Sequence, residues 1–176
     1  DRFNATILHE MTHAVMANQM DMSGLPAWFK EGTAEVISGA DVRLKADIAN
    51  GIDIKAQLDS VFTNTSLSAT PDANEVAGVY SGGYVTMRYL EEKIGASGIK
   101  AIMNTLASDP TKELTDAITA EGTYADLNAF KADLDANFAT FLSSMDLDNT
   151  DNGALGGADA SGGTARANTI VGASSA

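Results

Sequence analysis

The sequence predicts a mainly α-helical protein. Apolar residues recur at three- and four-residue spacing along most of the chain, which is the period of a helix buried along one face. β-branched residues gather only weakly, at 36–37 and 42–54, so the signal for strands is slight. With 176 residues, 44% of them hydrophobic, the chain has enough material for one domain with a substantial core.

The first half of the chain predicts two clear helices. Apolar spacing over residues 3–16 marks the first helix, and residues 21–24 break it. Proline is favoured at the first position of a helix, so a second helix is expected from Pro26 to about Gly39. Residues 41–50 are ambiguous.

The middle of the chain combines a short helix, a loop and a long helix. Residues 51–58 suit a short helix, whereas 63–72 are rich in Ser, Thr and Asn and end near a proline, which favours a loop. A third strong helix is expected from about Glu75 to Ile94, and Gly95 ends it.

Three shorter patterns complete the helical domain. A helix is expected over 97–107, closed by the Asp-Pro pair at 109–110, and another over 111–121. The last helix is expected over 123–145 with Thr123 as its N-cap.

The composition changes sharply after residue 145. Residues 146–176 are acidic and rich in Gly, Ala and Ser, with too little apolar bulk to build a core, so we predict a domain over 1–145 and a linker or tail over 146–176. Asp148 and Asp159 fall at positions 1 and 12 of a calcium loop, but Thr150 stands at position 3 and position 12 lacks the usual Glu. A plain linker is therefore the better interpretation.

Charge and composition exclude several classes of function. The formal net charge is −13 and the pI is near 4.3, so the surface repels phosphate backbones and nucleic-acid binding is not expected. The chain has no cysteine, which removes disulfides, thiol nucleophiles and thiolate metal sites. No apolar run approaches the roughly 20 residues of a membrane span. The opening residues read like the middle of a protein, and we expect this chain to be a piece of a longer one.

The most informative motif is the pentapeptide from His9 to His13, His-Glu-Met-Thr-His. Histidines at i and i+4 lie on the same face of a helix, where both imidazoles can bind one metal ion. Glu10 leaves the helix about 100° round from His9, beside the ion, where a carboxylate can take a proton from the attacking water. The competing interpretation is a surface helix with incidental histidines.

A third metal ligand is expected from an acidic residue, because no other His and no Cys is present. Glu31 lies 18 residues after His13, which leaves room for the first helix to end and a second helix to return past the metal. Glu35 lies one turn further on the same face. Ligating histidines usually donate their other N–H to a carboxylate, so Glu35 is the candidate partner for a ligand; a solvated surface Glu is the alternative.

The motif and the following Trp-Phe-Lys-Glu-Gly-Thr-Ala-Glu run, 28–35, together resemble the gluzincin zinc peptidases. The resemblance implies a helical zincin core with an active-site helix and a glutamate helix. It also implies that His9, His13 and Glu31 bind Zn²⁺ and that Glu10 is the general base and acid. Gluzincins usually carry an N-terminal β subdomain, which we expect here to be truncated or absent, or built in minimal form from 42–54.

In finer detail, residues 5–16 and 25–35 resemble the metallopeptidase domain embedded in some bacterial flagellins, the flagellinolysins. Clostridial collagenases share the same core. The resemblance implies an extracellular location at the flagellum surface, protein or peptide substrates, and flagellin neighbours in the filament. The absence of cysteine and the composition, rich in Ala, Asn, Thr, Ser and Asp, agree with this context.

Tyrosine is the candidate donor for the oxyanion of the transition state, since both histidines are used as ligands. Tyr80 and Tyr84 share a face of the predicted third helix with Gly83. The resemblance to related peptidases points to Tyr80, with Tyr84 in reserve. Packing roles for both residues are the alternative.

Three functions therefore remain open. The first is a zinc-dependent endopeptidase that hydrolyses extracellular proteins as an insert in a flagellin. The second is a structural insert of a surface filament in which zinc only stabilises the fold. The third is a free, secreted, collagenase-like peptidase. A purely structural zinc site needs no base, so Glu10 argues against the second.

Overall fold

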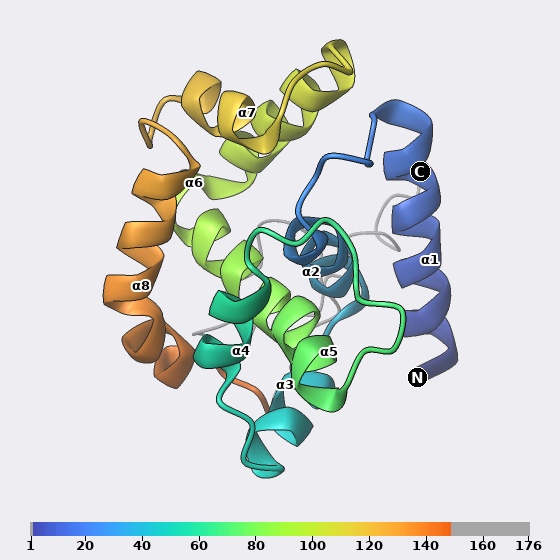
Figure 1. The fold of residues 1–176 in the computed structure, drawn as a ribbon, viewed down its shortest axis with the longest axis vertical. Coiled ribbons are helices and arrows are strands. Elements are labelled where there is room, and N and C mark those ends of the chain that lie inside the picture. The colour runs from blue at the N-terminus through green and yellow to red at the C-terminus, as the bar shows by residue number, and fades with distance from the viewer. Residues whose placement is uncertain (1, 149–176) are drawn as a thin grey trace, which may run out of the picture.

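The computed structural model describes residues 2–148, which contain eight helices and no strand (Figure 1). The predicted mainly α fold is therefore confirmed for this part of the chain. The helices are α1 (Arg2–Gln19), α2 (Ala27–Ser38), α3 (Asp41–Ala49), α4 (Ile54–Val61), α5 (Ala73–Val79), α6 (Ser81–Ser108), α7 (Leu114–Glu121) and α8 (Leu127–Ser144).

Helices α2 and α6 form the centre of the molecule, with α1 against α2 and with α7 and α8 against α6 (Figure 1). Most residues of α2 are buried, because it has neighbours on nearly every side. Trp28 is fully buried, and its Nε1 donates a hydrogen bond to the carbonyl of Phe62 at 3.0 Å. The core thus encloses the helix that carries Glu31 and Glu35.

Two glycines let the backbones of α2 and α6 touch. A Cβ atom added at Gly32 would lie 2.3 Å from the carbonyl oxygen of Gly83. A Cβ atom added at Gly83 would lie 2.6 Å from the carbonyl oxygen of Trp28. Only glycine fits at both positions, so α2 lies as close to α6 as two helices can.

The weak strand signal over 42–54 was misleading, because this region begins with the helix α3. Asp41 and Leu44 are both buried, and their spacing of three residues is that of a helix face. Asp53 then caps α4 by accepting a hydrogen bond from the backbone N–H of Ala56.

The long helix predicted over 75–94 is divided at Tyr80. Helix α5 begins at Ala73, where Asp72 accepts a hydrogen bond from the N–H of Glu75, and it ends at Val79. Helix α6 begins at Ser81 and contains a kink at Gly95, whose φ of 70° lies in the region that favours glycine. The predicted break at Gly95 is therefore present, whereas the break at Tyr80 was not predicted.

The last helix starts later than predicted. Asp126, not Thr123, is its N-cap and accepts a hydrogen bond from the N–H of Ala129 at 2.7 Å. Thr123 instead donates its hydroxyl to the carboxylate of Glu121.

The described structure continues slightly past the predicted boundary at 145. Leu147 packs against the core, and Lys45 forms an ion pair with Asp148. Most of the predicted tail, including the candidate calcium positions after Asp148, lies outside the described residues. None of the helices in residues 2–148 is long and apolar enough to cross a bilayer.

Candidate metal centre

The three predicted metal ligands meet between α1 and α2. Nε2 of His9 lies 3.1 Å from Oε2 of Glu31, and Nε2 of His13 lies 3.0 Å from the same oxygen. The two Nε2 atoms are 3.1 Å apart. Three potential ligand atoms from two helices therefore converge on one point.

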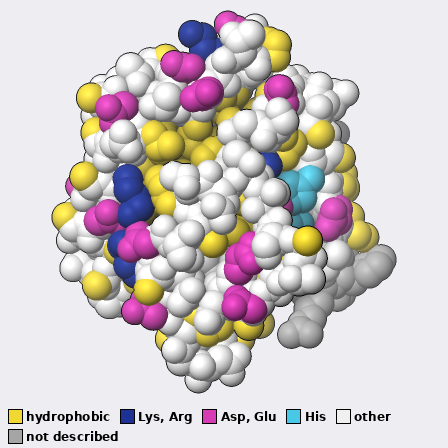
Figure 2. All heavy atoms as spheres, in the orientation of Figure 1, with side chains coloured by type: hydrophobic (Ala, Val, Ile, Leu, Met, Phe, Trp, Pro, Cys, Tyr) yellow, Lys and Arg dark blue, Asp and Glu magenta, His cyan; other side chains and the backbone are white. Residues whose placement is uncertain are grey.

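This donor set fits Zn²⁺. Two ligands at about 2.1 Å from a tetrahedral ion are separated by about 3.4 Å, so the observed separations need to expand only slightly. Two histidines and one glutamate are a ligand set of catalytic zinc sites, which keep a fourth position for water or substrate. The side chains of His9, His13 and Glu31 are 12%, 23% and 20% exposed, and Figure 2 shows the histidines at the surface.

Glu35 holds His9 from the side opposite the ligand cluster. Its Oε1 lies 3.0 Å from Nδ1 of His9, so that Nε2 is left to face the cluster. Arg43 donates from Nε to the other oxygen of Glu35 at 3.1 Å. The structure therefore places Glu35 beside His9, where the sequence predicted a partner for a ligand. Glu35 is buried, so the alternative of a solvated surface Glu is wrong.

Ion pairing organises the cluster when no metal is bound. Burial lowers the pKa of His9, but hydrogen bonds and charges from Glu31 and Glu35 outweigh burial and raise this pKa from 6.5 to about 9. Burial opposes ionisation of Glu31, yet His9 and His13 hold the pKa of this carboxyl below its usual value. Metal binding must therefore displace a proton from His9.

Glu10 lies on α1 next to His9 and is exposed. The structure does not bring it into hydrogen-bond contact with His9, His13 or Glu31, which is compatible with a base that acts on a water rather than on a ligand. Its catalytic role stays a prediction.

Tyr80 lies beside the cluster, at the break between α5 and α6. Its ring stacks on the imidazole of His9 with 6.0 Å between centroids, and the guanidinium of Arg43 lies 4.7 Å from the ring centroid. Burial and the charge of Glu31 raise the pKa of Tyr80, although Arg43 opposes this shift. The hydroxyl therefore stays protonated at neutral pH and can donate a hydrogen bond.

Tyr84 does not reach the cluster. Its side chain is fully buried, and its hydroxyl donates to Oδ1 of Asp41 at 2.8 Å. The sequence placed Tyr80 and Tyr84 on one helix face, but the break at Tyr80 separates their surroundings. Tyr84 joins α6 to α3, so of the two tyrosines only Tyr80 lies beside the cluster.

Arg43 was missed by the sequence analysis. It contacts both Glu35 and Tyr80 from α3, a segment whose secondary structure was ambiguous. Its position depends on the turn at Gly39 and Ala40, which returns α3 toward α2. No spacing or motif in the sequence signals that return.

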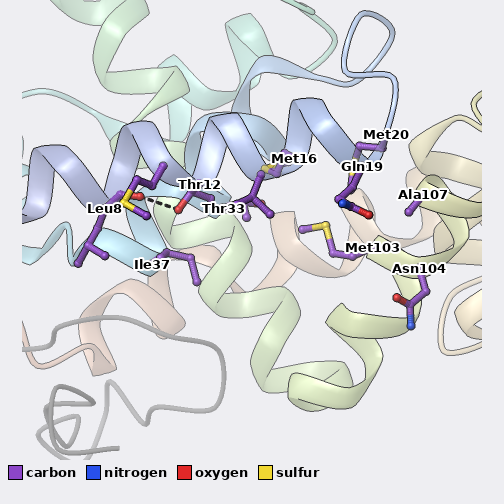
Figure 3. Close-up of a pocket in the computed structure, with 12 residues that line it drawn as sticks. Leu8, Thr12, Met16, Gln19, Met20, Thr33, Ile37, Met103, Asn104 and Ala107 are labelled. Carbon is purple, nitrogen blue, oxygen red and sulfur yellow. Dashed lines mark hydrogen bonds between the residues drawn. The ribbon is translucent and has the colours of Figure 1, made fainter. Parts of the chain in front are cut away.

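An apolar groove lies along another side of α1 and α2, away from the metal cluster (Figure 3). This apolar groove has a volume of about 450 Å³ and is lined by residues such as Leu8 and Met11 of α1 and Met103 of α6. On α2 it is lined by Thr33 and Ile37, which lie about 200° round the helix from Glu31 and Glu35. The groove and the metal cluster therefore occupy different sides of α2.

Residues 2–147 match the family model described as the Peptidase MA superfamily. Because the match covers most of the sequence, the chain belongs to this superfamily. This membership supports the predicted zincin-like metallopeptidase. No curated protein and no solved structure matches the chain significantly. The finer resemblance to flagellinolysins and clostridial collagenases stays a prediction.

Proposed function

We propose that this member of the Peptidase MA superfamily is a zinc-dependent endopeptidase. The observation that carries the proposal is the convergence of His9, His13 and Glu31, with Glu35 behind His9. A cluster that served only to join two helices would not need an accessible side, yet all three ligand side chains are partly exposed. An open position for a reacting water is the property that distinguishes catalytic zinc sites from structural ones.

Each residue around the cluster has a separate role in the proposed peptide hydrolysis. A bound Zn²⁺ would supply the Lewis acid that polarises the scissile carbonyl and lowers the pKa of a water. Glu10 takes the proton from the attacking water and passes it to the leaving amine. Tyr80 donates its hydroxyl to the oxygen that becomes negative in the transition state. Glu35 fixes the ring of His9 so that its lone pair faces the metal.

We also propose that the substrates are extracellular proteins, and that the domain is displayed as an insert in a bacterial flagellin. The resemblance of residues 5–16 and 25–35 to flagellin-embedded peptidases supports this context, as do the absence of cysteine and the net charge of −13. Sequence on both sides of the chain in its parent protein tests it. Flagellin-like helical ends are expected, whereas a signal peptide with binding modules would favour a free secreted peptidase.

The experiment that tests the enzyme combines metal analysis with casein digestion, using the full chain, Glu10→Gln and the control Glu92→Gln. Glu92 is an exposed glutamate on α6, so its substitution changes the charge equally. One zinc per chain in all three proteins is expected, with digestion lost only in Glu10→Gln. Zinc without digestion by the wild-type chain would favour a structural insert, and a chain without zinc would overturn the proposal.

A further inference from the structure

Arg43 closes a ring of contacts around the candidate metal centre. Its Nε donates to Glu35, whose other oxygen contacts Nδ1 of His9. Its guanidinium lies over the ring of Tyr80, and that ring in turn stacks on His9. One side chain thus touches both the partner of a metal ligand and the candidate oxyanion donor.

The charge of Arg43 compensates the burial of Glu35. Glu35 is only 4% exposed, and a buried carboxylate needs a positive partner or several hydrogen bonds. Arg43 supplies that positive partner, because its Nε lies 3.1 Å from Oε2 of Glu35.

The helix that carries Arg43 is fixed to the core. Asp41 begins α3, is buried, and accepts the hydroxyl hydrogen bond of the fully buried Tyr84. Leu44 is also fully buried. Arg43 lies between these two anchors and is itself 45% exposed, so its head group can be changed without opening the core.

We infer that Arg43 is a positioning residue of the metal centre, which keeps Glu35 oriented toward His9 and holds the ring of Tyr80 in place. This inference rests on the proposed function, because the role of Arg43 is exerted through a metal ligand. It assigns no contact between Arg43 and the reacting atoms.

The first test is the zinc affinity of the full chain, measured by competition with a chromophoric chelator. Arg43→Gln is compared with Lys45→Gln, which removes the same charge from the same helix; Lys45 is 56% exposed and pairs with Asp148 rather than with the site. Loss of a group that bonds a metal ligand directly costs about 10- to 100-fold in affinity. Arg43 acts one contact further away, so we expect a loss of about 3- to 10-fold for Arg43→Gln and none for Lys45→Gln.

The second test asks whether Arg43 affects zinc affinity through Glu35 or through its charge alone. In a Glu35→Gln background the ion pair with Arg43 is already lost, so Arg43→Gln should cause no further loss of zinc affinity. In the wild-type background Arg43→Lys should recover zinc affinity because it keeps the charge. The kcat for casein should fall in Arg43→Gln beyond any change in KM, since Tyr80 acts in the transition state.

The outcomes distinguish this inference from the function on which it rests. Zinc binding and digestion by the wild-type chain, with equal zinc affinity in Arg43→Gln and Lys45→Gln, would overturn the role of Arg43 alone. An undiminished loss in the Glu35→Gln background would also overturn it. A wild-type chain that binds no zinc would overturn the function and the inference together. Thermal midpoints of all variants check that each protein is folded.

Discussion

The pair of helices α1 and α2 has a polar side, where the histidines and glutamates meet, and an apolar side, which forms the groove of Figure 3. On the polar side, His9 and Glu35 are each held by hydrogen bonds or ion pairs to named partners. On the apolar side, Met11 and Val15 are 56% and 61% exposed and the lining carries no charged residue.

The comparison shows that a hollow and a reactive site need not coincide. A large apolar cavity is a common guide to a binding site, and clustered titratable groups with shifted pKa values are another. In this chain the two guides point to different sides of the same helices. The proposed chemistry follows the titratable groups, because peptide hydrolysis by a metallopeptidase needs a metal, a base and a donor rather than volume.

The largest expected difference between the two sides comes from one substitution on each side of α2. Glu31→Ala removes a metal ligand and should weaken zinc binding by more than about 100-fold, beyond the loss typical for an outer partner. Ile37→Ala lies on the groove side and should leave zinc affinity unchanged. Chelator competition measures both, and a comparable loss in Ile37→Ala would show that the two sides are coupled.

The two tyrosines allow a residue beside the metal cluster, Tyr80, to be compared with a core residue, Tyr84. Tyr80→Phe should lower kcat by about 100-fold, as removal of one oxyanion donor does, without a change in zinc content. Tyr84→Phe should instead lower the free energy of unfolding by about 1–3 kcal/mol, because buried Asp41 loses its hydrogen bond. Casein kinetics and urea unfolding measure the pair; the reverse pattern would make Tyr84 the donor.

The polar side should make the stability of the metal-free chain depend on pH, whereas the groove lining has no group that titrates. The pKa of His9 is raised from 6.5 to about 9, so its contribution is complete below pH 6.5 and is lost as the pH rises through 9. We expect the free energy of unfolding to fall by about 1–3 kcal/mol over this range. The zinc-loaded chain has already lost the proton, and its profile should be flatter. Urea unfolding at several pH values checks both forms.

The smallest effect is expected on the groove side. Met11→Gln and Val15→Thr replace exposed apolar side chains by polar ones, so the free energy of unfolding should change by no more than about 0.5 kcal/mol. Zinc affinity and casein digestion should match the wild-type chain. A loss of digestion with zinc retained would mean that the groove takes part in substrate binding.

The convergence of His9, His13 and Glu31 was predictable because it depends on local geometry. Spacing of four residues on a helix places His9 beside His13, and the same rule places Glu35 beside Glu31. The prediction needed only one assumption about tertiary structure, namely that the second helix packs against the first. The mainly α fold was predictable for the same reason, since it follows from the helical period of the apolar residues.

The surroundings of the ligands were not predictable, because they depend on how separate elements return to one another. Arg43 reaches the site only through the turn that follows α2. Tyr84 shares a helical spacing with Tyr80, yet it faces Asp41 of another helix. The strand signal over 42–54 was misleading for a different reason. β-branched residues favour strands only weakly, and burial of Leu44 against the core favours a helix instead.

The contact between Gly32 and Gly83 has a consequence for anyone who redesigns this protein. Side-chain volume normally sets the distance between two helices, so a repacked core shifts its helices by fractions of an ångström. Here backbone atoms already meet, and α2 can only move outward from α6. The contact between the two glycines therefore sets the shortest possible distance between α2 and α6. It thereby limits how far Glu31 and Glu35 can move toward α6. Other core side chains can therefore be varied widely while the two glycines keep the geometry of the candidate ligands.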